Sequence, residues 1–184
     1  MKNRLQKGFT LIELLIVVAI LAVLVVVALM IINPAEGQKK ARDTKRMKDL
    51  GALQTIITQY LEDGNTPPSG NCLIGAAGCT TAGTTDKTQP CDSNWLGIDF
   101  CDYAQSIPLD PANNAVRSCV NGGTQQVPTF NDSCTMIYQV KVEGGKYEIN
   151  VRQESKAGAS NVLSDGGNST QWAETGSDRD LLGD

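Results

Sequence analysis

An unbroken apolar segment dominates the N-terminal part of the chain. Residues 9–32 form a run of 24, in which Thr10 and Glu13 are the polar members. As a helix this run would span about 36 Å, which is enough to cross a hydrocarbon core of roughly 30 Å. A secretory signal peptide has a shorter apolar core, of about 7–15 residues, with a small-residue cleavage site after it. We therefore expect a retained membrane anchor.

A second, amphipathic helical pattern follows the anchor. Its apolar residues recur three or four positions apart, which predicts a stripe covered by a sheet: Met47, Leu50, Leu53, Ile57, Tyr60 and Leu61. Asp63-Gly64, followed by two prolines, predicts that the helix ends near residue 63. Pro34, with Gly37 close behind, predicts either a kink within one long helix or a boundary between two helices.

Loops are expected after this helix. Residues 64–134 are rich in small polar residues and proline, and within them residues 95–103 have the apolar content needed to pack. Alternating apolar positions in residues 135–142 and 146–152 then predict a hairpin, joined through Glu143-Gly144-Gly145.

A shorter third strand is expected near residues 161–163 or 171–174. The order of helix, loops and hairpin predicts an α+β fold. In this fold a long N-terminal helix, with a membrane-spanning half and an amphipathic half, packs on a small antiparallel sheet beside a disulfide-rich loop region.

The formal net charge of −4 is unevenly distributed along the chain. Residues 39–48 carry six basic side chains and one acidic one, whereas residues 64–184 carry seven Lys or Arg against fourteen Asp or Glu. An acidic head is a poor match for nucleic acid, whose binding rests on neutralising phosphates. We interpret the basic run either as a solvated helix face or as a surface that meets the acidic heads of neighbouring copies.

All six cysteines lie in the polar part of the chain, which contains no histidine and no C-x-x-C pair. This pattern favours disulfides over a zinc site, and disulfides indicate an oxidising compartment outside the cytoplasm. The basic run would favour the opposite orientation, but long downstream domains cross membranes largely regardless of charge. Of the fifteen possible pairings, we favour sequential neighbours: Cys72 with Cys79, Cys91 with Cys101, and Cys119 with Cys134.

Glu13 is unusual because it lies five residues into the apolar run. An unpaired carboxylate in hydrocarbon is costly, so this side chain either reaches the headgroups or meets a positive partner in the membrane. The α-amino group of a neighbouring copy would serve as this partner if the chain were cut before Phe9. One such pair would fix the register between apolar helices, which packing alone defines poorly.

Residues 7–14, Lys-Gly-Phe-Thr-Leu-Ile-Glu-Leu, resemble the processing signature of type IV pilins and type II secretion pseudopilins. The resemblance implies that a prepilin peptidase and methylase cuts after Gly8 and N-methylates Phe9. It also implies that Glu13 pairs with a neighbour's amine during assembly. The implied domains are a leader peptide over residues 1–8, a long helix over 9–63 whose residues 9–32 span the membrane, and an extracytoplasmic globular head over 64–184.

The C-terminal region resembles the heads of major secretion pseudopilins. The resemblance rests on Ile107-Pro108-Leu109-Asp110-Pro111, the strand at residues 146–154 and Asp165-Gly166-Gly167-Asn168. It implies a structural calcium ion, for which three aspartates could supply oxygen ligands: Asp165, Asp178 and Asp180. The alternative is that these residues form acidic surface turns, and no other cofactor is expected.

Two classes of function fit these features. The favoured one is a non-enzymatic subunit of a homo-oligomeric pilus or pseudopilus filament, serving adhesion, motility, DNA uptake or protein secretion. Such a subunit would lie in the inner membrane, in contact with lipid and an assembly platform, before it enters an extracellular or periplasmic filament. The alternative is a monomeric, membrane-anchored, disulfide-rich binding protein. No nucleophile–base pair or phosphate-binding glycine motif supports an enzyme.

Overall fold

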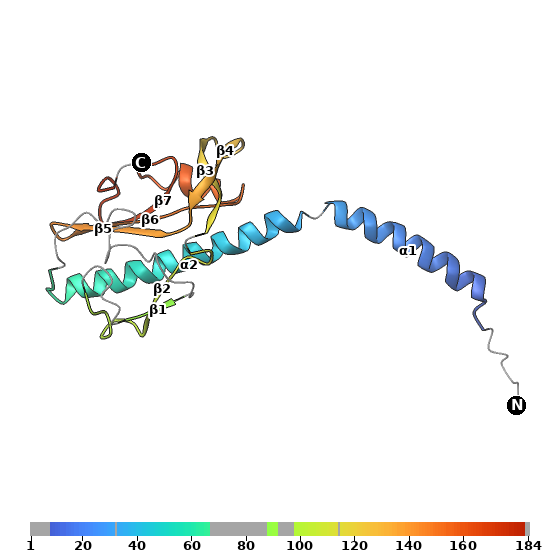
Figure 1. Cartoon of the computed structure of the whole chain (residues 1–184), viewed down its shortest axis with the longest axis horizontal. Helices are drawn as coiled ribbons and strands as arrows, with labels where there is room; N and C mark the ends of the chain where they lie inside the picture. The colour runs from blue at the N-terminus through green and yellow to red at the C-terminus, as the bar shows by residue number, and fades with distance from the viewer. Residues whose placement is uncertain (1–7, 32, 67–87, 92–97, 114, 183–184) are drawn as a thin grey trace, which may run out of the picture. The chain divides into compact units, whose positions relative to one another are not determined.

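The structure is a computed structural model, and it describes residues 8–31, 33–66, 88–91, 98–113 and 115–182. The chain divides into two compact units, residues 1–37 and residues 38–184. Figure 1 shows an apolar helix in the first unit, and a helix, strands and loops gathered into a head in the second. The observed architecture confirms the expected α+β class.

Helix α1, Leu11–Ile31, is the one described helix long and apolar enough to cross a membrane, with the candidate span at Leu11–Leu29. No side chain in this span is buried within the chain. The apolar surface of α1 is therefore free for lipid or for other copies of the helix.

Helix α2, Pro34–Glu62, begins as a separate helix. The Asn33 side chain accepts a hydrogen bond from the backbone N–H of Glu36 at 3.2 Å. Pro34 occupies the first turn, where a backbone N–H would have no acceptor within the helix, so its missing N–H costs no helical hydrogen bond. Of the two expectations for Pro34, the structure shows the boundary between two helices. The helix ends as predicted, because Gly64 adopts a positive φ of 79° and donates to the carbonyl of Leu61.

A three-stranded antiparallel sheet packs on α2 (Figure 1). Its strands are β5, Tyr138–Glu143, β6, Lys146–Val151, and β7, Ala173–Gly176, in the order β5-β6-β7. Gly144 and Gly145 join β5 to β6 with φ values of 60° and 80°, as a tight hairpin turn requires. The predicted hairpin is confirmed, although β5 begins three residues later than residue 135.

The core forms where the α2 stripe meets one face of this sheet. Its members include apolar residues of the helix and of alternating strand positions: Leu50, Leu53, Ile56, Ile57, Tyr138, Val140, Val142, Tyr147, Ile149 and Val151. Tyr60 and Leu61 pack against this core as predicted. The prediction for Met47 was wrong, because this side chain is 36% exposed at the solvent edge of the stripe.

The third strand, β7, lies two residues beyond one of the two expected positions. The other position is helical, because residues 161–163 belong to α3, Ala159–Leu163. Ala159 and Val162 are both buried, and their spacing of three suits one face of a helix rather than one face of a strand.

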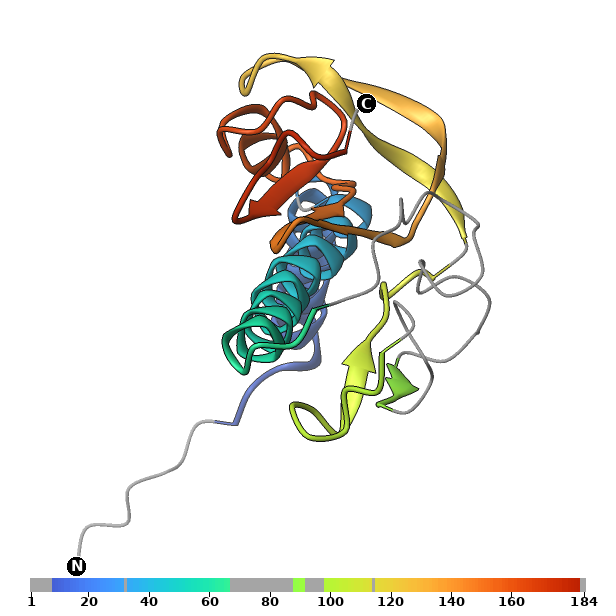
Figure 2. The ribbon, with the colours of Figure 1, turned by 90° about the vertical axis from the view of Figure 1, so that its left-hand side faces the viewer.

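Within the described part of the region expected to be loops, the structure has four further strands. Two short strands, β1, Thr88–Pro90, and β2, Ser106–Pro108, pair antiparallel. A longer hairpin consists of β3, Val116–Gly123, and β4, Pro128–Thr135, with two register shifts along its length. Figure 2 shows this hairpin extending along one side of the head.

Candidate functional site

Thr10 and Glu13 form a capping box at the start of α1. The Glu13 carboxylate accepts hydrogen bonds from the backbone N–H and the hydroxyl of Thr10, both at 2.8 Å. The Thr10 hydroxyl oxygen in turn accepts the backbone N–H of Glu13 at 3.3 Å. This reciprocal pattern satisfies donors that a helix start leaves free. Within a single copy, Glu13 therefore has a partner in its own helix.

The peptide bond before Phe9 is unobstructed in the described structure. Phe9 is 91% exposed, and a Cβ added at Gly8 would meet no atom within 4 Å. Both residues precede α1 and have no helical backbone hydrogen bonding to protect them. The predicted processing residues, Gly8 and Phe9, thus lie together with Glu13 in one exposed segment of six residues.

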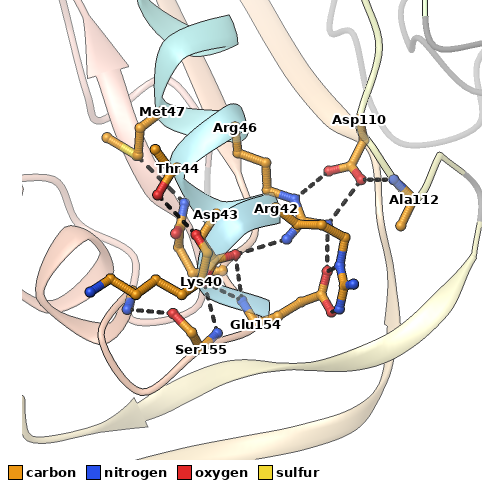
Figure 3. Close-up of polar contacts among 12 residues, drawn as sticks. Lys40, Arg42, Asp43, Thr44, Arg46, Met47, Asp110, Ala112, Glu154 and Ser155 are labelled. Carbon is orange, nitrogen blue, oxygen red and sulfur yellow. Dashed lines mark hydrogen bonds and ion pairs between the residues drawn. The ribbon is translucent and has the colours of Figure 1, made fainter. Parts of the chain in front are cut away.

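A cluster of buried charges joins α2 to the head (Figure 3). The Arg46 side chain is fully buried, and its guanidinium donates to both oxygens of Asp110, at 2.7 and 3.0 Å. It also pairs with Asp43 at 2.8 Å and with Glu154 at 2.7 Å. One arginine therefore ties together three carboxylates that are distant in the chain.

Asp43 and Arg42 extend this cluster. The Asp43 carboxylate accepts the backbone N–H groups of Glu154, at 2.9 and 3.1 Å, and of Ser155, at 2.7 Å. Arg42 donates to the two oxygens of Glu154 at 2.9 and 2.6 Å. Two arginines thus face three carboxylates, which satisfies the charges that folding removes from water.

The pKa values reflect this mutual compensation. Burial acts to lower the pKa of Arg46, but the hydrogen bonds and charges of Asp110 and Glu154 outweigh burial and raise it above its usual value. Burial acts to raise the pKa of Glu154, but Arg42 and Arg46 outweigh it and lower the pKa. These paired charges join α2 to the segments after β2 and β6, and we call the cluster of Arg42, Asp43, Arg46, Asp110 and Glu154 the lock.

The lock changes the interpretation of the basic run at residues 39–48. Arg42 and Arg46 pair with carboxylates in the head of their own chain, and Arg46 is fully buried there. Sequence reasoning missed this, although a signal was present. Arg46 and Asp43 lie four and seven positions before Leu50, so they continue the buried stripe of α2 with charged residues.

Two of the three aspartates proposed as calcium ligands accept hydrogen bonds from within the chain. Asp165 accepts the backbone N–H groups of Gly167, at 3.0 Å, and Glu174, at 2.7 Å. Asp178 pairs with Lys146 at 3.0 Å and accepts the N–H of Asp180 at 3.2 Å. Among the described residues, no group of three ligand-type side chains that includes these aspartates lies within 4.8 Å. Calcium binding by them stays a prediction.

Among the described residues the structure contains two disulfides, and both join sequential neighbours. Cys91 bonds to Cys101 beside β1, and Cys119 bonds to Cys134 across the β3–β4 hairpin. Cys72 and Cys79 lie outside the described residues. The two observed bonds therefore follow the pairing that the sequence favoured.

The N-terminal segment also matches a known family. The chain fits the family model of the prokaryotic N-terminal methylation motif over residues 3–29, which include the Gly8–Phe9 bond and Glu13. The match ends inside α1, so relatives of the whole chain are needed to assign the head.

Relatives extend the match into the head. The chain is 36% identical over 116 residues to fimbrial protein Q of Moraxella bovis, covering 60% of this chain and 71% of that protein. It is 35% identical over 131 residues to type II secretion system core protein G of Aeromonas hydrophila, covering 71% of this chain and 85% of that protein.

A third relative is type IV major fimbrial protein FimA of Dichelobacter nodosus, which is 40% identical over 88 residues, or 44% of this chain and 53% of that protein. No solved structure matches the chain at the same level of significance. The capping box, the exposed apolar helix and these relatives agree, and the chain belongs to the family of type IV pilins and type II secretion pseudopilins.

Proposed function

We propose that the mature protein starts at Phe9 and polymerises into a filament through α1. A prepilin peptidase would remove residues 1–8 and methylate the new α-amino group. One observation carries this proposal: Glu13, the only ionisable residue in α1, lies in a capping box directly beside an unobstructed Gly8–Phe9 bond. A plain membrane anchor needs neither this acid nor this exposed bond.

In the filament, the Glu13 carboxylate would leave its hydrogen bonds with Thr10 and bind the α-amino group of a neighbouring copy. Cleavage before Phe9 creates a positive α-amino group within the apolar environment, where an unpaired charge is costly. The Glu13 carboxylate of an adjacent copy is a matching partner, because an ammonium group adds an attraction between opposite charges that the uncharged Thr10 donors lack. This exchange would define the axial offset between subunits.

The head would then tile the outside of the filament, with its disulfides suited to an oxidising compartment. We propose a structural role without catalysis, in which an inner-membrane platform extracts the subunit from lipid. Pilus functions such as adhesion, motility or DNA uptake, and the secretion function of a pseudopilus, remain the two uses. The 85% coverage of core protein G supports the second, and the fimbrial relatives support the first.

Intact-mass and N-terminal mass spectrometry of the protein from cells with its assembly machinery tests the proposal. The mature chain should begin with N-methyl-phenylalanine from position 9. A chain that retains Met1, or one cut behind α1, would contradict the proposal and favour the anchored binding protein.

A further inference from the structure

Arg152 lies between an aromatic ring and the disulfide of the β3–β4 hairpin. It directly follows β6, and its guanidinium carbon is 3.8 Å from the centre of the Trp172 ring. One terminal nitrogen, Nη1, is 3.5 Å from Sγ of Cys119 and 3.7 Å from Sγ of Cys134. The same nitrogen is 3.5 Å from the side-chain oxygen of Gln171. A single guanidinium therefore contacts both sulfur atoms of the bond.

This guanidinium has no anionic partner among the residues that the structure describes. Arg152 belongs to none of the ion pairs there, and its Nε is buried without a hydrogen-bond acceptor. Burial lowers the pKa of the guanidinium. A partly buried cation without a carboxylate is costly, in contrast to Arg46 with its three carboxylates. The cost would fall if a negative charge formed beside it.

The disulfide lies in an apolar setting that screens charge poorly. Cys119 and Cys134 are 0% and 3% exposed, and they pack with Ala112 and Met136 in a small cluster of their own. Electrostatic attraction is stronger in such surroundings than in water. A charge on either sulfur atom would therefore interact strongly with the adjacent guanidinium.

The other charged groups on the described segments around this disulfide are exposed or already paired. Arg117 on β3 and Asp132 on β4 are exposed to water, which screens them. Asp110 and Glu154 are held in the lock. In the described part of the hairpin and its neighbours, Arg152 is thus the charged group in contact with the sulfur atoms.

The other observed disulfide has the opposite electrostatic setting. The sulfur atoms of Cys91 and Cys101 lie within 4.8 Å of a carboxylate oxygen of Asp99. Cys101 is also exposed, so water reaches this bond. A neighbouring carboxylate opposes the formation of a thiolate, whereas a neighbouring guanidinium favours it. The two bonds should therefore differ in how readily they are reduced.

Reduction creates the negative charge that Arg152 lacks. A thiolate of an external dithiol attacks one sulfur atom, the S–S bond breaks, and the other cysteine leaves as a thiolate. The second thiol of the reagent then attacks the mixed disulfide and releases the second cysteine. Two electrons pass from the dithiol, which becomes a disulfide, to the former cystine. A thiolate that leaves beside the Arg152 guanidinium is stabilised by its charge.

From this geometry we propose that Cys119–Cys134 is a site of thiol–disulfide exchange with dithiols, and that Arg152 is the positioning residue that shifts its equilibrium towards the reduced form. In an oxidising compartment the bond stays closed, and of the two observed bonds it is the more readily reduced by a dithiol. Its reduction frees β3 from β4, a hairpin in which few residues are apolar. This inference concerns the head alone and does not depend on filament assembly.

Equilibration of the full-length protein in detergent with mixtures of reduced and oxidised dithiothreitol tests the proposal. Alkylation and peptide mass spectrometry measure the reduced fraction at Cys119–Cys134 and at Cys91–Cys101. We expect Arg152→Met to lower the reduction equilibrium constant of the first pair about fivefold at pH 8, where a stabilised thiolate contributes. At pH 6 the thiols are protonated with or without Arg152, so the two proteins should agree.

Two further variants separate charge from shape. Arg152→Lys keeps a cation and should retain most of the wild-type constant at pH 8. Lys48→Met removes an exposed charge on α2 and should match the wild type at both pH values. Equal constants for the wild type and Arg152→Met at pH 8 would overturn the proposal. The same loss at pH 6 as at pH 8, or the same loss in Arg152→Lys, would also overturn it, because a purely structural role predicts either result.

A measurement on the wild type alone covers the case in which Arg152→Met does not fold. In the fully reduced protein, the rate of alkylation by iodoacetamide follows the thiolate fraction of each cysteine. The rates at Cys119 and Cys134 should reach half of their maximum at a lower pH than those at Cys91 and Cys101. The same midpoint for all four cysteines, or the reverse order, contradicts a role for Arg152 in the exchange.

Discussion

Arg46 shows how a charged residue can belong to the interior of this fold. It lies on the buried face of α2, and three carboxylates from α2, the loop after β2 and the chain after β6 converge on it (Figure 3). A buried ion pair is not in itself a large source of stability, because desolvation offsets the attraction. Loss of one partner is different, since it leaves the others buried and uncompensated.

Arg46→Met should therefore destabilise the head strongly. Methionine fills a similar volume, but it leaves Asp43, Asp110 and Glu154 without their shared cation, at a cost of about 3–5 kcal/mol in the free energy of unfolding. Lys48→Met, at an exposed position of the same helix, should change it by less than about 0.5 kcal/mol. Denaturant unfolding of the full chain in detergent measures both, and equal values for the two variants would refute the lock.

Sequence reasoning singled out exposed candidate residues more readily than buried ones. Gly8, Phe9 and Glu13 stand out because a glycine, an aromatic residue and an acid at this spacing are unusual at the start of a long apolar run. Asp110 and Glu154 gave no such signal, because their partner Arg46 is 64 positions from the first of them. The pairing depends on how the chain folds back on itself, which local patterns do not reveal. The Thr10 capping box was also missed, although its residues are three apart.

At the level of secondary-structure elements, prediction succeeded where the hydrophobic pattern was strong. The β5–β6 hairpin has alternating apolar residues and a Gly144-Gly145 turn, so its sequence specifies the structure locally. The β3–β4 hairpin was missed because few of its residues are apolar and its register shifts break the alternation. The Cys119–Cys134 disulfide supports this hairpin in place of a large apolar face.

Removal of that disulfide should cost more than removal of the other observed one. Cys119 and Cys134 are buried and 15 positions apart, whereas Cys91 and Cys101 are 10 positions apart and Cys101 is exposed. We expect the double variant Cys119→Ala/Cys134→Ala to lose about 3 kcal/mol of unfolding free energy, and more than Cys91→Ala/Cys101→Ala. The reverse order in thermal or denaturant melts would contradict this assignment.

Residues 165–180 contain the three predicted calcium ligands. If Asp165, Asp178 and Asp180 gather around a calcium ion, a chelator should lower the melting temperature of the protein, because an ion that binds only the folded state stabilises it. Asp178→Asn should abolish the difference between melts with calcium and with chelator, whereas Asp132→Asn in β4 should preserve it. Melting curves that coincide with and without chelator would remove calcium from the account.

At the scale of the whole molecule, the exposed apolar surface of α1 is the feature that favours the proposed assembly with other copies. Its large apolar side chains, from Leu11 to Leu29, are 49–82% exposed within one copy, and that surface must be covered by lipid or by other helices. Packing between such uniform helices has little axial preference, so we propose Glu13 as the residue that defines the axial offset. This combination could be predicted from the sequence because one charge interrupts an otherwise uniform pattern.

The most direct test compares filaments sheared from cells that make the wild type, Glu13→Ala or Glu62→Ala in the presence of the assembly machinery. We predict that Glu13→Ala inserts into the membrane at wild-type levels but yields no sheared filaments, or filaments with an altered subunit offset. Glu62→Ala, which removes an exposed acid at the end of α2, should assemble normally. Filaments of Glu13→Ala with wild-type yield and helical parameters would contradict the assembly role assigned to α1 and its one carboxylate.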